Sequence, residues 1–160
     1  MIPRIGFGYD IHRLEAGRRL VIGGTEIPWH KGCTGHSDGD PLIHAICDAM
    51  LGAAGAGDIG KHFPDNSPEF KDIDSRILLR KTVDIVTKAG YRFAQADSTV
   101  CLEKPKISSF IPAMIEQLAA TLGVQKDQLS VKAKSGEKIG FVGREEGVAA
   151  YAVVLLEKIK

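Results

Sequence analysis

The chain has 160 residues, of which 44% are hydrophobic and 26% are charged, and these proportions are typical of one compact globular domain. The 21 lysines and arginines nearly balance the 20 aspartates and glutamates, which argues against a strongly basic surface for nucleic acid. A chain of this length buries enough surface to fold without a disulfide or a structural metal, so any metal ligands need another explanation.

Neither a membrane-spanning helix nor a targeting segment is expected. The longest nearly unbroken apolar run, 148–156, is about half of the ~20 residues that a spanning helix requires. The first residues match neither a signal peptide nor a transit peptide, which predicts a cytoplasmic protein, or one of a plastid-type organelle if a leader was removed. Cys33, Cys47 and Cys101 contain no C-x-x-C pair, which favours reduced thiols.

The first half of the chain predicts two strands, a loop and a helix. Residues 4–12 alternate, so four apolar side chains share one side of a strand while Asp10 and His12 share the other. A short strand is expected at 20–22, and a polar, glycine-bearing loop at 29–39. Asp40 followed by a proline is a helix-start signal. The helix that it begins is expected to stop at Gly55 and Gly57, with His44 in its first turn.

The second half predicts a long loop followed by alternating helices and strands. Residues 58–72 are rich in Gly, Pro, Asp and Asn, and loops of this length often bind a ligand or act as a lid. Helices are expected at 74–89 and 109–122, and strands at 91–102, 129–133 and 148–156. This order predicts a single α/β domain over residues 1–160, with one mixed sheet and helices packed mainly on one face.

Two familiar patterns carry no function in this context. The segment 55–60 matches G-x-G-x-x-G by letter, but it follows a helix, whereas dinucleotide binding requires a strand before the motif and a helix after it. Residues 36–38 contain the residue types of a His-Ser-Asp triad, yet neighbours in sequence cannot align a nucleophile, a base and an acid.

A metal site is suggested by Asp10, His12 and His44. Residues two apart on a strand are separated by about 6–7 Å and point the same way, so the first two can converge on one ion with a third ligand from the facing helix. One Asp and two His leave a tetrahedral position open, as in catalytic zinc sites. The alternative is a strand-end Asp that caps a loop and a His that bonds to the backbone.

Two polar segments favour phosphate chemistry. His36, Ser37 and the N–H groups of the helix that starts at Pro41 lie within eight residues of His44, and a helix N-terminus attracts anions. A metal with an open position beside such a site suggests phosphoryl chemistry. Residues 132–138, KAKSGEK, would suit a phosphate and a divalent metal; the alternative is a solvated basic turn.

Seven segments, in order along the chain, carry a resemblance to a known family. They are 8–12 (GYDIH), 35–40 (GHSDGD), 51–54 (LGAA), 57–61 (GDIGK), 63–65 (FPD), 74–76 (DSR) and 137–144 (EKIGFVGR). Together they resemble the methylerythritol cyclodiphosphate synthases of the non-mevalonate isoprenoid pathway, over essentially the whole chain. The resemblance implies a phosphorus–oxygen lyase that converts 4-diphosphocytidyl-2-C-methyl-D-erythritol 2-phosphate to 2-C-methyl-D-erythritol 2,4-cyclodiphosphate plus CMP.

The resemblance also implies a role for each matching position. Asp10, His12 and His44 would hold Zn²⁺ or another divalent transition metal, and Glu137 a second ion, Mg²⁺ or Mn²⁺. His36 and Ser135 would be catalytic, donating to the charge that develops on phosphate. The substrate-binding positions would be Asp10, His12, His36, Ser37, Asp58, Ile59, Gly60, Phe63, Pro64, Asp65, Asn66, Ser67, Leu102, Lys106, Ile107, Ser108, Lys134, Ser135, Gly136, Glu137, Phe141 and Arg144.

Within that set the resemblance distinguishes three parts of the substrate. His36 and Ser37 would contact phosphates, residues 58–60 and 63–67 the methylerythritol portion, and residues 102–108 the cytidine. One departure from the family lies at 134–136, where a run of threonines is common. Ser135 keeps a hydroxyl there, but Lys134 replaces a neutral donor, so the diphosphate contacts are expected to differ in detail.

The family further implies a homotrimer with active sites between subunits. The segment 148–156 agrees with this, because it is apolar on both faces, as a strand covered by partner chains would be. Tyr9, Ile11, Phe141 and Arg144 match positions near a central cavity that could accommodate a prenyl diphosphate.

The implied reaction is an intramolecular attack of the 2-phosphate on the β-phosphorus, which needs no protein general base. Two alternatives remain open. A metal-dependent phosphohydrolase would use the same ligands but give a linear product, and a non-catalytic CDP-binding module would give no product.

Overall fold

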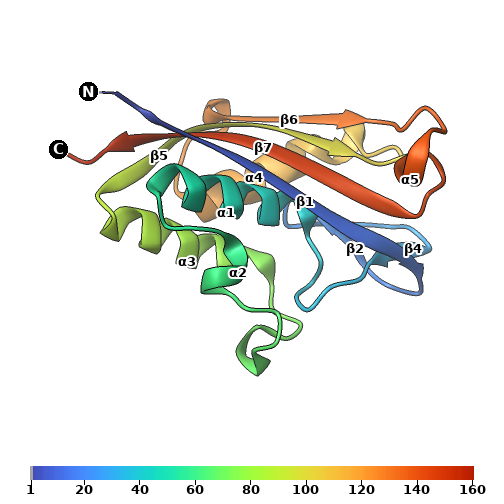
Figure 1. The fold of residues 1–160 in the computed structure, drawn as a ribbon. Helices are drawn as coiled ribbons and strands as arrows, with labels where there is room; N and C mark the ends of the chain where they lie inside the picture. The colour runs from blue at the N-terminus through green and yellow to red at the C-terminus, as the bar shows by residue number, and fades with distance from the viewer. Residues whose placement is uncertain (1) are drawn as a thin grey trace.

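A five-stranded mixed sheet forms the centre of the computed structural model, which describes residues 2–160 (Figure 1). The strand order is β4 (Lys31–Cys33), β1 (Arg4–Ala16), β7 (Gly147–Lys158), β5 (Tyr91–Cys101) and β6 (Leu129–Lys134). Only β5 and β6 run parallel, and the other neighbours are antiparallel. A separate two-stranded sheet contains β2 (Leu20–Ile22) and β3 (Thr25–Ile27).

Three helices cover one face of the sheet. Helix α1 (Pro41–Ala54) packs on β1 and β7, α3 (Ser75–Lys88) packs against α1, and α4 (Ile111–Leu122) packs against β6. The short helices α2 (Ile59–His62) and α5 (Gly140–Gly143) and three 3₁₀ turns (Pro68–Phe70, Ser108–Phe110 and Lys126–Gln128) lie in the connections. The predicted class, one mixed sheet with helices on one face, is confirmed.

The opposite face of the sheet exposes a row of large apolar side chains. The predicted alternation of β1 is correct, but its apolar side points outward rather than into the core of this chain. The exposed fractions include 70% for Ile5 and 63% for Phe7. The outer row, as we call it below, consists of Ile5, Phe7, Tyr9, Ile11, Tyr151 and Val153. An exposed apolar patch of this kind marks an interaction surface.

Helix α1 forms where the sequence predicts it, because both of its ends are capped. The Asp40 side chain accepts from the Ile43 N–H at 3.0 Å, and Pro41 occupies the first turn. Gly55 ends the helix with a left-handed φ of 71°. Ten side chains of the helix are buried, so the helix fills the core beneath β1 and β7.

Two glycines allow β1 to lie close to α1. A Cβ atom added at Gly8 would lie 1.9 Å from the Ala45 carbonyl oxygen, and one at Gly6 would lie 1.8 Å from that of Ala49. Because successive side chains alternate across a strand, Asp10 and His12 follow these glycines on the same side. The close approach therefore directs both side chains toward α1.

Several short elements differ from the sequence prediction. The predicted loop 29–39 contains β4, which pairs with residues 14–16 of β1, and β1 extends four residues beyond His12 to Ala16. The predicted loop 58–72 contains α2, capped by Asp58, which accepts from the Lys61 N–H at 2.9 Å. Strands β3 and β4 are each three residues long and are specified by pairing with their partner strands, so no local alternation pointed to them.

The cysteines and the apolar segments agree with the sequence analysis within residues 2–160. Cys33, Cys47 and Cys101 are all free thiols, and burial raises the pKa of Cys47 to about 12. None of the helices that the structure describes is both long enough and apolar enough to cross a membrane. The run 148–156 lies in β7, as predicted.

Candidate metal centre and its pocket

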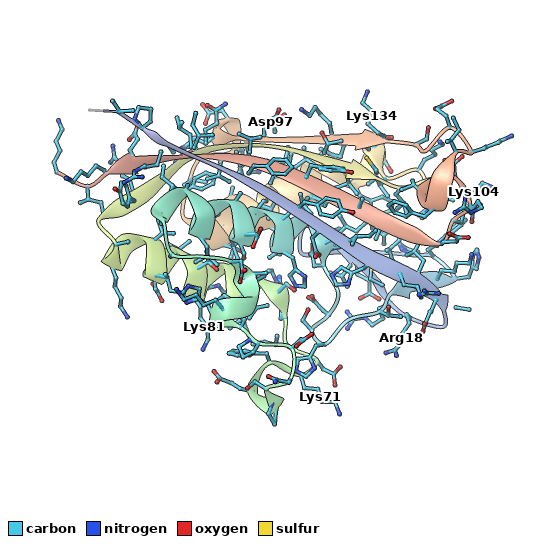
Figure 2. All side chains as sticks on the ribbon, viewed as in Figure 1. Arg18, Lys71, Lys81, Asp97, Lys104 and Lys134 are labelled. Atoms are coloured by element: carbon cyan, nitrogen blue, oxygen red, sulfur yellow. The ribbon has the colours of Figure 1, made fainter. Side chains whose placement is uncertain are left out.

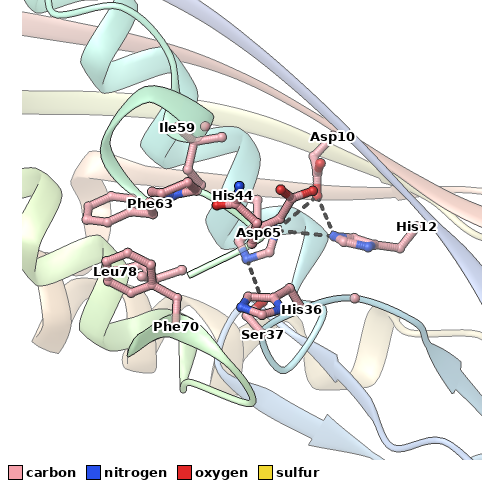
Figure 3. A pocket seen from close by; sticks show the side chains of 14 residues that line it. Asp10, His12, His36, Ser37, His44, Ile59, Phe63, Asp65, Phe70 and Leu78 are labelled. Carbon is pink, nitrogen blue, oxygen red and sulfur yellow. Dashed lines mark hydrogen bonds and ion pairs between the residues drawn. The ribbon is translucent and has the colours of Figure 1, made fainter. Parts of the chain in front are cut away.

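Three side chains from β1 and α1 converge on one point (Figure 3). The His12 Nε2 atom lies 2.8 Å from Asp10 Oδ2 and 3.2 Å from His44 Nδ1. The remaining pair, His44 Nδ1 and Asp10 Oδ2, is separated by 3.3 Å. Within residues 2–160 this is the only group of at least three His, Cys, Asp or Glu side chains with ligand atoms this close together. The three predicted ligand residues are therefore brought together.

Hydrogen bonds on the far side of each imidazole orient its ring. The His12 Nδ1–H donates to the Thr34 carbonyl oxygen at 2.8 Å, because a carbonyl can only accept, and this leaves the Nε2 lone pair facing inward. The His44 Nε2 atom lies 2.9 Å from Ser75 Oγ and 3.1 Å from Ser37 Oγ. Contacts of this kind with the outer nitrogen accompany most metal-bound histidines.

The residues present fit a tetrahedral divalent ion. Ligand atoms about 2.0–2.2 Å from zinc in tetrahedral geometry lie about 3.3–3.6 Å from one another. The two separations that involve His44 Nδ1 are 3.2 and 3.3 Å, whereas His12 Nε2 and Asp10 Oδ2 are closer, at 2.8 Å. Asp10 Oδ2 is buried and has no hydrogen-bond partner. A buried carboxylate oxygen without a donor is costly, and a metal ion would satisfy it.

The electrostatics of the site favour a positive charge at the same point. Burial acts to raise the pKa of Asp10, but the contacts with His12 and His44 outweigh it and hold the pKa below its usual value. Burial acts to lower the pKa of His12, but Asp10 and the Thr34 carbonyl outweigh it and raise the pKa. An anionic oxygen between two imidazoles thus stabilises a cation, whether a proton or a metal ion.

The three residues form part of the wall of a pocket of about 680 Å³, a volume within the usual range for small-molecule sites. The polar lining includes His36 and Ser37, and Phe63 and Phe70 meet edge to face at 5.5 Å on the apolar side. The full lining is Asp10, His12, Gly35, His36, Ser37, His44, Ile59, Gly60, Phe63, Pro64, Asp65, Asn66, Phe70 and Leu78 (Figure 3). Charged and apolar parts of one ligand could therefore be held side by side.

Two predicted residues of the 58–67 segment lie outside this lining. Asp58 turns its side chain toward the Lys61 N–H and caps α2 instead of facing the pocket. Ser67 contributes its backbone, because its carbonyl oxygen accepts from His36 Nε2 at 2.7 Å. The loop after α2 is thereby tied to the catalytic candidate His36.

The remaining predicted substrate residues form a second group on this chain. None of Leu102, Lys106, Ile107, Ser108, Lys134, Ser135, Gly136, Glu137, Phe141 and Arg144 lines the pocket of Asp10. In Figure 2, Lys134 at the end of β6 and Lys71 in the loop after α2 lie on opposite sides of the molecule. The prediction therefore does not come together as one site within a single chain.

This second group has its own hydrogen-bond network, and we call residues 102–108 and 134–137 the β6 cluster. The Leu102 N–H donates to the Lys134 carbonyl at 2.9 Å, and the Gly136 N–H donates to Glu103 Oε2 at 2.8 Å. Ser135 Oγ donates to Glu137 Oε1. The side chains of Leu102 and Ile107 are buried in the core, so these two could contact a ligand only through their backbone.

Sequence reasoning missed five residues of the site, of which Gly35 lines the pocket through the motif GHSDGD. Phe70 and Leu78 complete the apolar wall, and Asp38 and Ser75 lie behind His44. Phe70 carried no signal because it stands alone in a polar loop. Asp38 and Ser75 lie in the motifs GHSDGD and DSR. The motifs could have identified them as candidates, but not the side chains that they contact.

Comparisons with known proteins agree with this geometry. The sequence pattern of the YgbB family matches residues 3–157. The 2-C-methyl-D-erythritol 2,4-cyclodiphosphate synthase of Bacteroides thetaiotaomicron is 52% identical over 155 residues, which cover 97% of this chain and 98% of the relative.

Two solved structures share the fold. The bifunctional IspDF of Campylobacter jejuni aligns over 99% of this chain with a TM-score of 0.95 and 38% identity, and the match spans 43% of that longer chain. A 2C-methyl-D-erythritol-2,4-cyclodiphosphate synthase in a CDP-bound form aligns over 96% of this chain and 100% of its own, with a TM-score of 0.89 and 38% identity. The chain described here therefore belongs to the YgbB family, the 2-C-methyl-D-erythritol 2,4-cyclodiphosphate synthases, and is an enzyme of the lyase class.

Proposed function

We propose that this chain converts 4-diphosphocytidyl-2-C-methyl-D-erythritol 2-phosphate to 2-C-methyl-D-erythritol 2,4-cyclodiphosphate and CMP, in non-mevalonate isoprenoid biosynthesis, with residues 1–160 acting as one catalytic domain. The observation that carries the proposal is the convergence of Asp10, His12 and His44 on the wall of a pocket that also presents His36 and Ser37. The CDP-bound relative supports a cytidine nucleotide as the class of ligand.

The substrate supplies its own nucleophile in this reaction. An oxygen of the 2-phosphate forms a bond to the β-phosphorus, the bond from that phosphorus to the bridging oxygen breaks, and CMP leaves with the electron pair. A phosphate is already ionised at neutral pH, so no side chain needs to act as a general base. The protein must fold a flexible polyanion into an in-line geometry, and such orientation can supply up to ~7–11 kcal/mol of the barrier.

The metal pocket and the β6 cluster would each contribute part of this binding and charge stabilisation. Asp10, His12 and His44 would hold Zn²⁺ or a similar ion, and Glu137 Mg²⁺ or Mn²⁺; bound ions would withdraw charge from the diphosphate. Ser37 and His36 face the same pocket as the ligands and would orient phosphate oxygens. The Ser135 hydroxyl would donate to the charge that develops as the ring closes.

The separation of the two groups supports an assembled enzyme. We infer a homotrimer in which the metal pocket of one chain faces the β6 cluster of its neighbour, and the outer row of apolar side chains is covered by the other subunits. Arg144, which pairs with Glu146 at 3.0 Å, would lie near the central axis, where it could bind a prenyl diphosphate. A solution mass three times that of one chain is expected.

The product distinguishes this function from its alternatives. Phosphorus NMR of the reaction mixture should show a cyclic diphosphate, with one CMP released per turnover. A linear phosphate product would instead indicate a phosphohydrolase, and CDP binding without turnover a nucleotide-binding module.

The variant His12→Ala tests the role of the metal centre. It should lose bound zinc and at least ~10³-fold in rate, because a catalytic metal stabilises the transition state by several kcal/mol, and it should stay folded. His30→Ala is the matched control, since His30 is exposed and lies outside the pocket. Near-normal turnover by His12→Ala would refute the assignment.

A further inference from the structure

A buried hydroxyl lies behind the metal ligand His44. Ser75, the first residue of α3, is fully buried. Its Oγ atom donates to Asp38 Oδ1 and lies 2.9 Å from His44 Nε2, and its backbone N–H donates to Asp38 Oδ2 at 3.0 Å. The three side chains thus form a continuous chain of hydrogen bonds from a carboxylate to an imidazole.

The direction of these hydrogen bonds follows from counting protons. A carboxylate at neutral pH only accepts, and a serine hydroxyl carries one proton. Because Ser75 donates that proton to Asp38, its oxygen can only accept from His44. The Nε2 atom of His44 must then carry the ring proton, and the Nδ1 lone pair faces Asp10 Oδ2, 3.3 Å away.

We propose that Asp38 and Ser75 are positioning residues that fix His44 in its Nε2–H tautomer and so present Nδ1 to the metal. The inference rests on the proposed function, because it assigns a role around one of the proposed ligands. The Thr34 carbonyl has the same effect on His12 from the opposite ring nitrogen.

The position of the proton on His44 Nε2 also affects Ser37, which lies on the proposed phosphate-binding side of the pocket. Ser37 Oγ lies 3.1 Å from His44 Nε2 and accepts from the Gly39 N–H at 3.2 Å. Because His44 Nε2 carries a proton, it can only donate a hydrogen bond. The Ser37 hydroxyl therefore accepts from His44 and does not donate to it. The Ser37 O–H is then free to donate to a phosphate oxygen of the substrate.

Helix capping does not account for the Ser75 hydroxyl. The start of α3 is capped by Asp74, whose side chain accepts from the Arg76 N–H at 2.8 Å. The Ser75 hydroxyl points instead to Asp38 and His44. A substitution that removes only this hydroxyl should therefore affect the imidazole more than the helix.

The test measures the histidine tautomer and the zinc affinity in the 160-residue chain. Long-range ¹H–¹⁵N spectra of the histidine rings should show His44 as the Nε2–H tautomer in wild type, with His44→Ala identifying its signals. Ser75→Ala should lose this fixed tautomer and bind zinc about 10–100-fold more weakly in competition with a chelator. Ser98→Ala is the control, since Ser98 is also buried but donates to the Ser130 carbonyl, outside the site.

Asp38→Asn provides a second variant of nearly unchanged volume, should Ser75→Ala fail to fold. An amide N–H facing Ser75 would let the hydroxyl donate to His44, so the Nδ1–H tautomer should become populated and zinc affinity should fall. An unchanged Nε2–H signal together with wild-type zinc affinity in a folded variant would overturn the inference. Failure of the proposed function is distinguishable, because it would appear as a linear product or as no product with wild type, whereas the histidine tautomer and the zinc affinity are measured without turnover.

Discussion

At the scale of single residues, the candidate site depends on which polar side-chain atoms already have a hydrogen-bond partner within the chain. Both imidazoles bond through their outer nitrogens, whereas the Oδ2 atom of Asp10 is buried without a hydrogen bond. The same contrast separates Asp10 from Asp40, a second acid nearby. Asp40 is fully buried, and its carboxylate accepts from three backbone N–H groups, those of Gly23, Gly24 and Ile43. Asp40 therefore stabilises the fold, and Asp10 is left for chemistry.

The stability of the fold should depend on pH through Asp40. Burial, with Asp38 nearby, raises the pKa of Asp40 from 3.8 to about 6. The folded state then holds this proton more tightly than the unfolded state. Its contribution to stability is present below about pH 4 and is lost as the pH rises through about 6, a change of about 3 kcal/mol.

The variant Asp40→Asn isolates this effect, since it cannot titrate. Urea unfolding at pH 4 and at pH 6.5 should show that the stability of wild type, measured relative to the variant, falls by about 2 kcal/mol, which is most of the full change. The substitution also changes the N-cap of α1, but the resulting change in stability is the same at both pH values and cancels in this comparison. A difference between the two proteins that stays the same at both pH values would contradict the prediction.

At the scale of secondary structure, the metal centre requires β1 and α1 to lie unusually close. Gly6 and Gly8 face the α1 backbone without a side chain between them. Asp10 and His12 on β1 can then come within reach of His44, in the first turn of α1, although none of the three has a long side chain. The two glycines therefore allow the close approach that brings the residues of the candidate metal site together.

Gly8→Ala should separate the two elements. The added Cβ would meet the Ala45 carbonyl oxygen at 1.9 Å, so the backbone must shift. We expect a loss of about 1–3 kcal/mol in the free energy of unfolding, together with weaker zinc binding, because Asp10 and His12 move with β1. Chelator competition and urea unfolding measure the two effects.

Gly52→Ala is the matched control for that variant. Gly52 lies within α1, and a Cβ there would meet no atom within 4 Å. Alanine at this helical position should leave zinc affinity unchanged and stabilise the protein by roughly 0.5–1 kcal/mol. If Gly8→Ala behaved like Gly52→Ala, the close approach would not be what positions the ligands.

At the scale of the whole molecule, one chain carries two separate groups of functional residues and an exposed apolar face. The metal pocket lies between β1, α1 and the loop after α2, whereas the β6 cluster lies beyond β5 (Figures 1 and 2). The outer row is formed by the central strand β7 and its neighbour β1. Assembly through that face would bury the apolar row and could bring the two groups together across subunits.

Mixed assemblies should recover activity from two inactive chains. In co-expressed His12→Ala and Glu137→Ala, about a quarter of the interfacial sites should combine an intact metal pocket with an intact β6 cluster, since chains associate at random around a closed ring. Turnover of the purified mixed assembly measures this fraction.

A co-expressed pair of His12→Ala and Asp10→Ala provides the control, because both changes damage the same group and no intact site can form. Recovery in the first pair alone would locate each site between two subunits. Equal inactivity of both pairs would show that the two groups do not act across an interface.

Much of the candidate site was predictable because the sequence features that indicate it, a helix cap and strand alternation, each involve only a few neighbouring residues. The Asp40-Pro41 cap fixed the start of α1, strand alternation placed Asp10 and His12 on one side, and both held in the structure. The prediction for 4–12 was incomplete, however, since periodicity shows which side chains share a face but not which face is buried. Ile5 and Phe7 are exposed for that reason.

The sequence by itself indicated the family through its motifs, and it determined the order of the main helices and strands and the three residues of the candidate metal site. Capping and alternation could do this because they act over a few neighbouring residues. Only the tertiary structure decided that Ser75 and Asp38 lie behind His44, that Phe70 and Leu78 close the pocket, and that β4 pairs with β1. The reason is physical: those contacts join residues far apart in the chain, and their geometry exists only after β1, α1 and α3 have packed.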